Sequence, residues 1–314
     1  MYRARRWLLN GIGRLEVHEI LSLFMLAFLT ALYGFGLEDE SFAGEVLRIG
    51  KSAGPITMTI SLLAVVFFIA LFFLPKGGTV AGHAKVLGRV MLSFLVMLIA
   101  FEAVTHYIDA KQLPLQDEAL QRIDAGLFAG KQPSERMEWL NASLVNYLSS
   151  FVYLSWFGFT YATIFLMWRK GRQALMEYSA SALLTFYAGY ILYIVVPAYG
   201  PVFTYDYSTS VDEGLTAMMM DDKLFSPVAD AFPSLHTALS VVMFSIVRKY
   251  GGRWMWLYAP FMIGIIASTV HLRIHYAIDV IAGIVLAIAM GWICRSLVSR
   301  REIARQPDKG AVAG

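Results

Sequence analysis

The chain has 314 residues, of which 58% are hydrophobic and 16% are charged. Soluble domains carry about 25% charged residues, so this balance excludes an ordinary soluble enzyme and a disordered polypeptide. The single cysteine, Cys294, excludes an internal disulfide and a thiolate metal cluster. A net charge of +3 is too small to indicate a nucleic-acid partner. The composition therefore predicts an integral membrane protein.

Eight apolar runs approach the length of about 20 residues that a helix needs to cross a bilayer. They predict an all-α fold, a polytopic membrane helix bundle with about eight transmembrane helices. The runs are Ile20–Leu37, Ser52–Pro75, Val90–His106, Asn141–Trp168, Tyr178–Tyr205, Ala231–Val247, Trp254–Val270 and Tyr276–Cys294.

The basic residues predict the orientation of this bundle. If the N-terminus is cytoplasmic, the segments on that side carry 18 of the 26 Lys and Arg residues. Such a bias is typical of cytoplasmic loops. We therefore expect a bacterial inner-membrane protein with both termini in the cytoplasm and residues 298–314 as a cytoplasmic tail.

The outer segment 107–140 is too long for a simple turn and contains a helical pattern. Leu120, Ile123 and Leu127 recur at helical spacing, with charged residues between them. Two interpretations are open: an extracytoplasmic interfacial helix over a substrate entrance, or a solvated helix packed on the ends of the spans.

Two segments place ionisable residues at the outer ends of predicted spans. A charged residue at the bilayer centre costs about 2.5–3.5 kcal/mol or more, so such residues indicate function. In the first segment, Ser234 and the backbone N–H groups beside it form a helix N-terminus of the kind that binds phosphate, and His236 follows. In the second, His275 and Asp279 are four residues apart, a spacing that places them on one face of a helix.

These residues can carry out phosphoryl transfer. Asp279 would hold one tautomer of His275 and leave the other ring nitrogen free to attack phosphorus. His236 would donate a proton to the leaving oxygen. Arg273 and the N–H groups near Ser234 would neutralise the phosphoryl oxygens. The pattern therefore predicts a phosphohistidine intermediate on His275.

Other interpretations of the ionisable residues are weaker. A metal site made by His236, His275 and Asp279 lacks an evident fourth ligand, and the Pro-Ser before His236 favours an anion. Three further histidines fit ordinary hydrogen-bonded positions at helix ends: His18, His83 and His106.

The alternative function is a proton-coupled transporter or lipid flippase that uses the His and Asp cluster as a proton relay. Such carriers usually place their site near the bilayer midplane, between two related halves. Here the cluster lies at one end of the spans and the two halves of the chain do not match.

The two segments resemble the type 2 phosphatidic acid phosphatase superfamily, and most closely the branch that contains inositol phosphorylceramide synthase and its bacterial relatives. Pro233–His236 reads Pro-Ser-Leu-His where the family has Pro-Ser-Gly-His, and Leu235 is the form found in the synthase branch. His275 and Asp279 stand where the family has its final His and Asp. The resemblance implies that His275 is the nucleophile, Asp279 its partner and His236 the leaving-group acid, with no metal or cofactor.

The resemblance also implies a domain organisation and a substrate class. Residues 141–297 would form a six-helix catalytic core, preceded by accessory helices in residues 1–106 and a connector in residues 107–140. The substrate would be a lipid phosphate, such as a phospholipid, a ceramide-type lipid or a prenyl phosphate. The acceptor would be water in a phosphatase, or a lipid or polyol hydroxyl in a phosphotransferase.

The sequence departs from the family pattern at two places. Ser268-Thr269 replaces the Ser-Arg that precedes the final His, and the first motif, a Lys followed by Arg-Pro, has no match. Both departures remove phosphate-binding cations. We expect Arg273 and Lys223 to supply the missing positive charge.

Overall fold

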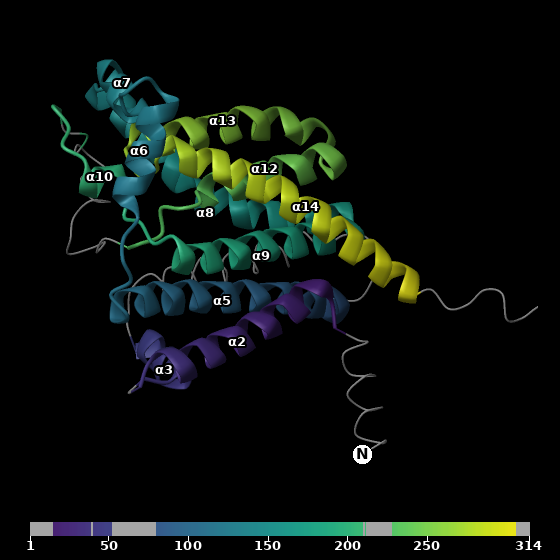
Figure 1. The fold of residues 1–314 in the computed structure, drawn as a ribbon. Helices are drawn as coiled ribbons and strands as arrows, with labels where there is room; N and C mark the ends of the chain where they lie inside the picture. The colour runs from purple at the N-terminus through teal and green to yellow at the C-terminus, as the bar shows by residue number, and fades with distance from the viewer. Residues whose placement is uncertain (1–14, 39, 52–79, 210, 212–227, 306–314) are drawn as a thin grey trace, which may run out of the picture.

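The computed structural model describes residues 15–38, 40–51, 80–209, 211 and 228–305, and every regular element in these ranges is a helix (Figure 1). The α-helices are α2 (Val17–Gly36), α3 (Phe42–Lys51), α5 (Val80–Ala110), α6 (Asp117–Leu127), α7 (Pro133–Arg136), α8 (Ser143–Lys170), α9 (Arg172–Val195), α10 (Pro201–Thr204), α12 (Leu235–Tyr250), α13 (Met255–His271) and α14 (Ala277–Arg305). Two short 3-10 helices are η1 (Glu138–Leu140) and η2 (Gly252–Trp254).

The predicted all-α membrane bundle is confirmed. Within the described ranges, six helices are long and apolar enough to cross a membrane: α2, α5, α8, α9, α13 and α14. The 16-residue helix α12 is shorter, but it packs against α8, α9, α13 and α14 at the centre of the bundle. The expected span Ser52–Pro75 lies outside the described residues. In the part of residues 141–297 that the structure covers, the long helices are α8, α9, α12, α13 and α14.

The two ends of the bundle differ in chemistry. α6, α7 and α10 gather at the end where α9 and α13 finish and α14 begins, and the last turn of α14 lies at the opposite end (Figure 1). α2 and α5 lie side by side and pack along α9. The end opposite α6 carries basic residues at several helix termini, Lys170, Arg172, Arg248 and Lys249, together with Arg295 in the second half of α14.

Polar contacts join neighbouring helices inside the bundle. The Ser22 and Tyr187 hydroxyls lie 3.0 Å apart between α2 and α9, and the Tyr178 hydroxyl of α9 donates to the Thr160 carbonyl of α8 over 2.9 Å. Because lipid tails are as apolar as the helices, close packing and such hydrogen bonds hold membrane helices together. Each bond is worth about 0.6 kcal/mol on average.

The predicted end of α9 is wrong. α9 ends at Val195, ten residues before the expected end at Tyr205, because Pro197 cannot continue a helix. The chain then turns at Gly200, whose φ is +96°. A Cβ on Gly200 would lie 2.2 Å from the carbonyl oxygen of Ile274, so only glycine permits this approach. The turn therefore packs directly beside the residue that precedes His275.

Leu235, the unusual residue of the Pro-Ser-Leu-His segment, packs against a glycine. It is buried in the core, and a Cβ on Gly189 of α9 would lie 2.5 Å from its Cδ2 atom. Gly189 thus makes the space that Leu235 occupies at the first position of α12. The close contact fixes the start of α12 relative to α9.

We expect Gly189→Val to lower the free energy of unfolding by about 1–3 kcal/mol, because the new side chain overlaps Leu235 in a filled core. Thermal unfolding in detergent measures the change. Gly158→Ala on α8, where a Cβ meets nothing within 4 Å, serves as the control. The double variant Gly189→Val/Leu235→Ala should recover part of the loss; no recovery would show that these two residues are not the cause.

Candidate active site

His275 is held by a backbone carbonyl. The residue lies between α13 and α14, its side chain is 3% exposed, and its Nδ1 is 2.8 Å from the carbonyl oxygen of Ala231. A carbonyl can only accept, so Nδ1 carries the hydrogen and donates it. The unprotonated ring nitrogen is then Nε2, and its lone pair is available to attack an electrophile.

Asp279 supports this arrangement at a longer distance. Its Oδ2 is 3.6 Å from Nδ1 of His275 and accepts the backbone N–H of Tyr276 over 2.8 Å. Because α14 begins at Ala277, His275 and Asp279 do not share a helix face as the spacing suggests. They meet because Asp279, in the first turn, folds back onto the residue before the helix, as in a capping box. Asp279 thus places a carboxylate beside the imidazole, while Ala231 provides its hydrogen bond.

His236 faces the free nitrogen of His275. It is the second residue of α12, and its Nδ1 lies 3.5 Å from Nε2 of His275. The rings of Tyr153 and Trp156 fix the imidazole, with centroids 4.4 and 4.5 Å from it. A nucleophile approaches within about 3–3.5 Å of the atom it attacks. A phosphoryl group in position for transfer would therefore lie between the two imidazoles and move them apart.

Ser234 caps α12 and leaves its neighbours available. Its Oγ accepts the N–H of Thr237 over 3.2 Å, and its own N–H donates to the carbonyl of Asp279 over 3.0 Å. The N–H groups of Leu235 and His236, the first two of α12, have no acceptor among the described residues. Helix N-termini with unpaired N–H groups bind phosphate, so these two groups are better placed than Ser234 itself to do so.

Two buried polar atoms of the site are unpaired. Within the described ranges, Oδ1 of Asp279 and Nε2 of His236 are buried and have no hydrogen-bond partner. More than 90% of buried polar groups are paired in folded proteins, so two such atoms in one place need an explanation. A polar ligand group that reaches these two atoms would supply one.

Arg273 has other partners than the expected phosphate. Its backbone is left-handed, with φ of +63°, and its guanidinium donates to Thr209. It also lies 3.4 Å from Oε1 of Glu138 and stacks over the Tyr207 ring at 3.8 Å from the centroid. A carboxylate thus partly neutralises this cation at the rim of the site. Lys223, the other expected cation, lies outside the described residues.

Asp124 on α6 holds the start of α14, a role that the motifs did not reveal. Its two oxygens accept the backbone N–H groups of Ala277 over 2.7 Å and Ile278 over 2.9 Å. Burial raises the pKa of this carboxyl, and the two N–H donors lower it again. The cap fixes the first turn of α14 and thereby Asp279.

Asp117 lies seven residues before Asp124, on the same face of α6, and holds the turn after α9. It accepts the N–H of Gly200 over 2.9 Å and the Tyr276 hydroxyl over 2.9 Å. Leu120, between the two acids, packs with Ala198, Ala231 and Tyr276. α6 therefore packs on the ends of the core helices, while Ile123 and Leu127 stay exposed. The repeat of acids on the Leu120 face was the sequence signal for this role.

Asp230 lies directly before Ala231 and near His275. Burial raises the pKa of the Asp230 carboxyl to about 6, and the charge of His275 acts in the opposite direction. Asp230 is therefore the acid of this loop whose charge changes just below neutral pH.

Most of the other histidines have structural partners. His18 lies 2.9 Å from the Ser93 hydroxyl, His271 lies 3.0 Å from Oδ1 of Asn146, and His83 packs edge-on against Trp168.

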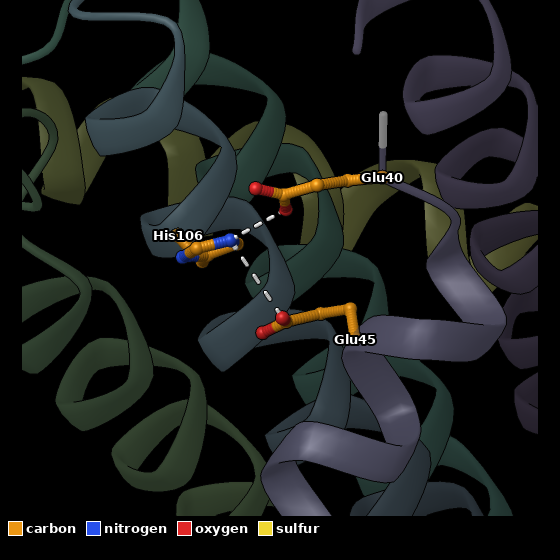
Figure 2. Close-up of side chains that lie close together, drawn as sticks. All are labelled: Glu40, Glu45 and His106. Atoms are coloured by element: carbon orange, nitrogen blue, oxygen red, sulfur yellow. Dashed lines mark hydrogen bonds and ion pairs between the residues drawn. The ribbon is translucent and has the colours of Figure 1, made fainter. Parts of the chain in front are cut away.

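His106 belongs to the group of possible metal ligands found in the described part of the chain, with Glu40 and Glu45 (Figure 2). Its Nε2 lies 2.8 Å from Oε2 of Glu40 and 3.8 Å from Oε2 of Glu45. Both oxygens of Glu45 also accept from Arg48, over 2.6 and 2.7 Å. A cation here would compete with Arg48 and with the proton of His106. The group sits between α3 and α5, separate from the Ala231–His275 contact.

Residues 118–293, more than half of the chain, match the PAP2 superfamily. The match begins in α6 and includes His236, His275 and Asp279. The chain therefore belongs to the PAP2 superfamily. It is an integral membrane enzyme of phosphatase type, from a superfamily that acts on lipid phosphates in general. The comparisons with curated proteins and with solved structures gave no match.

We expect Asp124→Ala to destabilise the protein by about 1 kcal/mol, as the loss of a helix cap does. Turnover should fall further than this loss of stability explains, because Asp279 loses its fixed position. Unfolding and turnover of a lipid phosphate measure the two effects. Glu118→Ala, an exposed acid of the same helix, is the matched control; equal losses in both variants would contradict a specific role for Asp124.

Asp230→Asn should change how stability depends on pH. The folded-state pKa of Asp230, about 6, lies above the unfolded value of about 3.9, so protonation favours the folded state. This contribution is full below about pH 4 and is lost as the pH rises through about 6. At pH 7 the Asp230→Asn variant should therefore be more stable than the wild type. Its stability should also lack the pH dependence that the Asp230 carboxyl causes. Unfolding midpoints across this pH range test it, with the exposed Asp109→Asn as control; parallel curves for wild type and Asp230→Asn would refute it.

Proposed function

We propose that the protein is a lipid phosphotransferase that works through a phosphohistidine on His275. The observation that carries this proposal is the bond from Nδ1 of His275 to the Ala231 carbonyl, which leaves the Nε2 lone pair directed at His236. One end of the bundle then holds the groups that the reaction needs: a nucleophile with its orienting groups, a proton donor and two free N–H groups.

In the first step, Nε2 of His275 attacks the phosphorus of a lipid phosphate ester. The N–P bond forms as the bond from phosphorus to the leaving oxygen breaks, and protonated His236 gives its proton to that oxygen. The N–H groups of Leu235 and His236 stabilise the negative charge on the phosphoryl oxygens. Asp279 stabilises the positive charge that develops on the His275 ring.

In the second step, the oxygen of an acceptor hydroxyl attacks the phosphohistidine. The O–P bond forms, the N–P bond breaks, and the acceptor proton passes to His236, which restores both histidines. Water as acceptor gives a phosphatase. A lipid or polyol hydroxyl gives the head-group transfer of the inositol phosphorylceramide synthase branch.

Two residues favour the transferase branch. Leu235 replaces the family's glycine and is accommodated by Gly189. Thr269 replaces the family's arginine, is fully buried, and its carbonyl accepts the N–H groups of Ile274 and His275 over 3.0 and 3.2 Å. Both departures are thus built into the packing around His275.

A cavity of about 370 Å³ offers a place for the acceptor. It is lined by Glu102, Gln112, Tyr199 and Ala229 among others, and so borders the loop that carries Ala231. Polar side chains and peptide groups in such a cavity suit a molecule with hydroxyl groups.

We place the site on the extracytoplasmic face and both termini in the cytoplasm. The support is the position of the basic residues, which gather at the end of the bundle opposite His275, as the positive-inside rule expects of cytoplasmic ends.

His275→Ala should abolish turnover of lipid phosphates without unfolding the protein, because it removes the ring nitrogen on which the proposed covalent intermediate forms. The matched control is His83→Ala, at the opposite end of the bundle, which should retain activity. A radiolabelled substrate phosphate should produce an acid-labile label on the wild-type protein that the His275→Ala variant lacks. Full activity in His275→Ala would end the proposal.

The acceptor can be identified by incubating phosphorylated lipids with and without a ceramide or polyol, followed by mass spectrometry. A transferase should form a new phosphorylated product only when the acceptor is present. Release of inorganic phosphate from the lipid alone would show a phosphatase instead, with the same role for His275.

A further inference from the structure

We propose that a groove at the end of the bundle opposite His275 binds an anionic phospholipid. The groove has a volume of about 440 Å³ and lies between α9, α12 and α14, where α12 ends. His236 and Lys249 are thirteen residues apart on α12, which separates the groove from the catalytic histidines by about 20 Å along the helix. The groove is therefore a second site, independent of the proposed reaction.

The groove carries uncompensated positive charge. Arg248, Lys249 and Arg295 line it together with a single acid, Glu177. Glu177 is already paired with Lys249, whose Nζ lies 2.8 and 2.7 Å from its two oxygens. Arg248 and Arg295 are exposed and have no ion-pair partner within the described ranges. Two guanidinium groups therefore face one groove without a counter-charge.

The geometry of Arg295 suits a phosphate. Its Nε donates to the Gly291 carbonyl over 3.2 Å, which fixes the stem of the side chain and leaves the two terminal nitrogens for a ligand. A planar guanidinium can donate two parallel hydrogen bonds to phosphate oxygens. Arg248, from the facing helix, adds a second cation on the other side of the groove.

The remainder of the groove lies toward the middle of the bundle and is mostly apolar, with Ser181 and Ser245 as its polar side chains. Val241 and Val242 are about two turns before Arg248 on α12, and Ala287 and Ile288 are about two turns before Arg295 on α14. The cations thus lie toward the end of the bundle where α12 ends, and the apolar side chains lie deeper in the bundle. A free phosphate would use only the first part, whereas a phospholipid fits both, with its phosphate at the arginines and an acyl chain along the valines.

In the orientation proposed above, the groove lies at the cytoplasmic end of the bundle, and this location agrees with the ligand. Basic pockets between transmembrane helices on the cytoplasmic side bind the head groups of anionic lipids, which are concentrated in that leaflet. Neutral phosphatidylcholine would leave the net charge of the arginines unbalanced. The expected ligand class is therefore a phospholipid with net negative charge.

The first test compares thermal unfolding of the full chain in nanodiscs of phosphatidylcholine, with and without added phosphatidylglycerol. The anionic lipid should stabilise the wild type. Arg248→Gln/Arg295→Gln should lose most of this effect and bind phosphatidylglycerol about thirty-fold more weakly. Arg253→Gln, an exposed basic residue at the same end but outside the groove, should respond like the wild type.

A second variant, Gly291→Leu, tests the groove without removing charge. A Cβ on Gly291 meets nothing within 4 Å, so the leucine can extend into the groove, and leucine favours helix over glycine. The variant should be at least as stable as the wild type in phosphatidylcholine and should lose the response to phosphatidylglycerol.

Two results would overturn the proposal. One is an equal response to phosphatidylglycerol in the wild type and in both groove variants. The other is full stabilisation by soluble glycerol phosphate, which would show a site for a free anion and not for a lipid.

Discussion

The hydrogen bond between Nδ1 of His275 and the carbonyl of Ala231 decides what the rest of the site can do. Without a fixed acceptor, the imidazole could present either nitrogen to a substrate. The acceptor is fixed because the N–H of Ala231 donates to the Ala198 carbonyl over 2.9 Å, which ties the loop before α12 to the turn after α9. One backbone oxygen thus connects two loops and leaves Nε2 as the ring nitrogen with a free lone pair. Asp279 adds charge beside an imidazole that is already oriented.

α6 stabilises this loop arrangement with two carboxylates. The start of α14 and the turn at Gly200 present backbone N–H groups that no helix satisfies. Asp124 and Asp117 accept hydrogen bonds from these N–H groups, which therefore need no water molecule as a partner. Negative charge at the N-terminus of α14 also interacts favourably with the helix dipole. The acids of α6 therefore fix the loops that position His275 and Asp279.

The long helices carry two sets of ionisable groups to opposite ends of the bundle. α12 carries His236 near its start and Arg248 in its last turn, and α14 carries Asp279 in its first turn and Arg295 in its second half. Charged groups at the ends of spans avoid the cost of burial in hydrocarbon, which explains why the middle of each helix is apolar. The same constraint separates the chemistry at one end from the proposed contact with anionic lipid at the other.

The sequence by itself determined the membrane bundle and most of its spans, and it singled out His236, His275 and Asp279, which the structure brings together, because apolar length and rare ionisable residues are local properties. It did not place the end of α9 correctly, since Pro197 interrupts an otherwise uncharged run. Only the tertiary structure decided that a carbonyl 44 residues away, at Ala231, orients His275, that Asp124 caps α14, and that Arg273 pairs with Glu138. These contacts depend on which loops meet at the end of the bundle, and backbone acceptors leave no trace in the pattern of side chains.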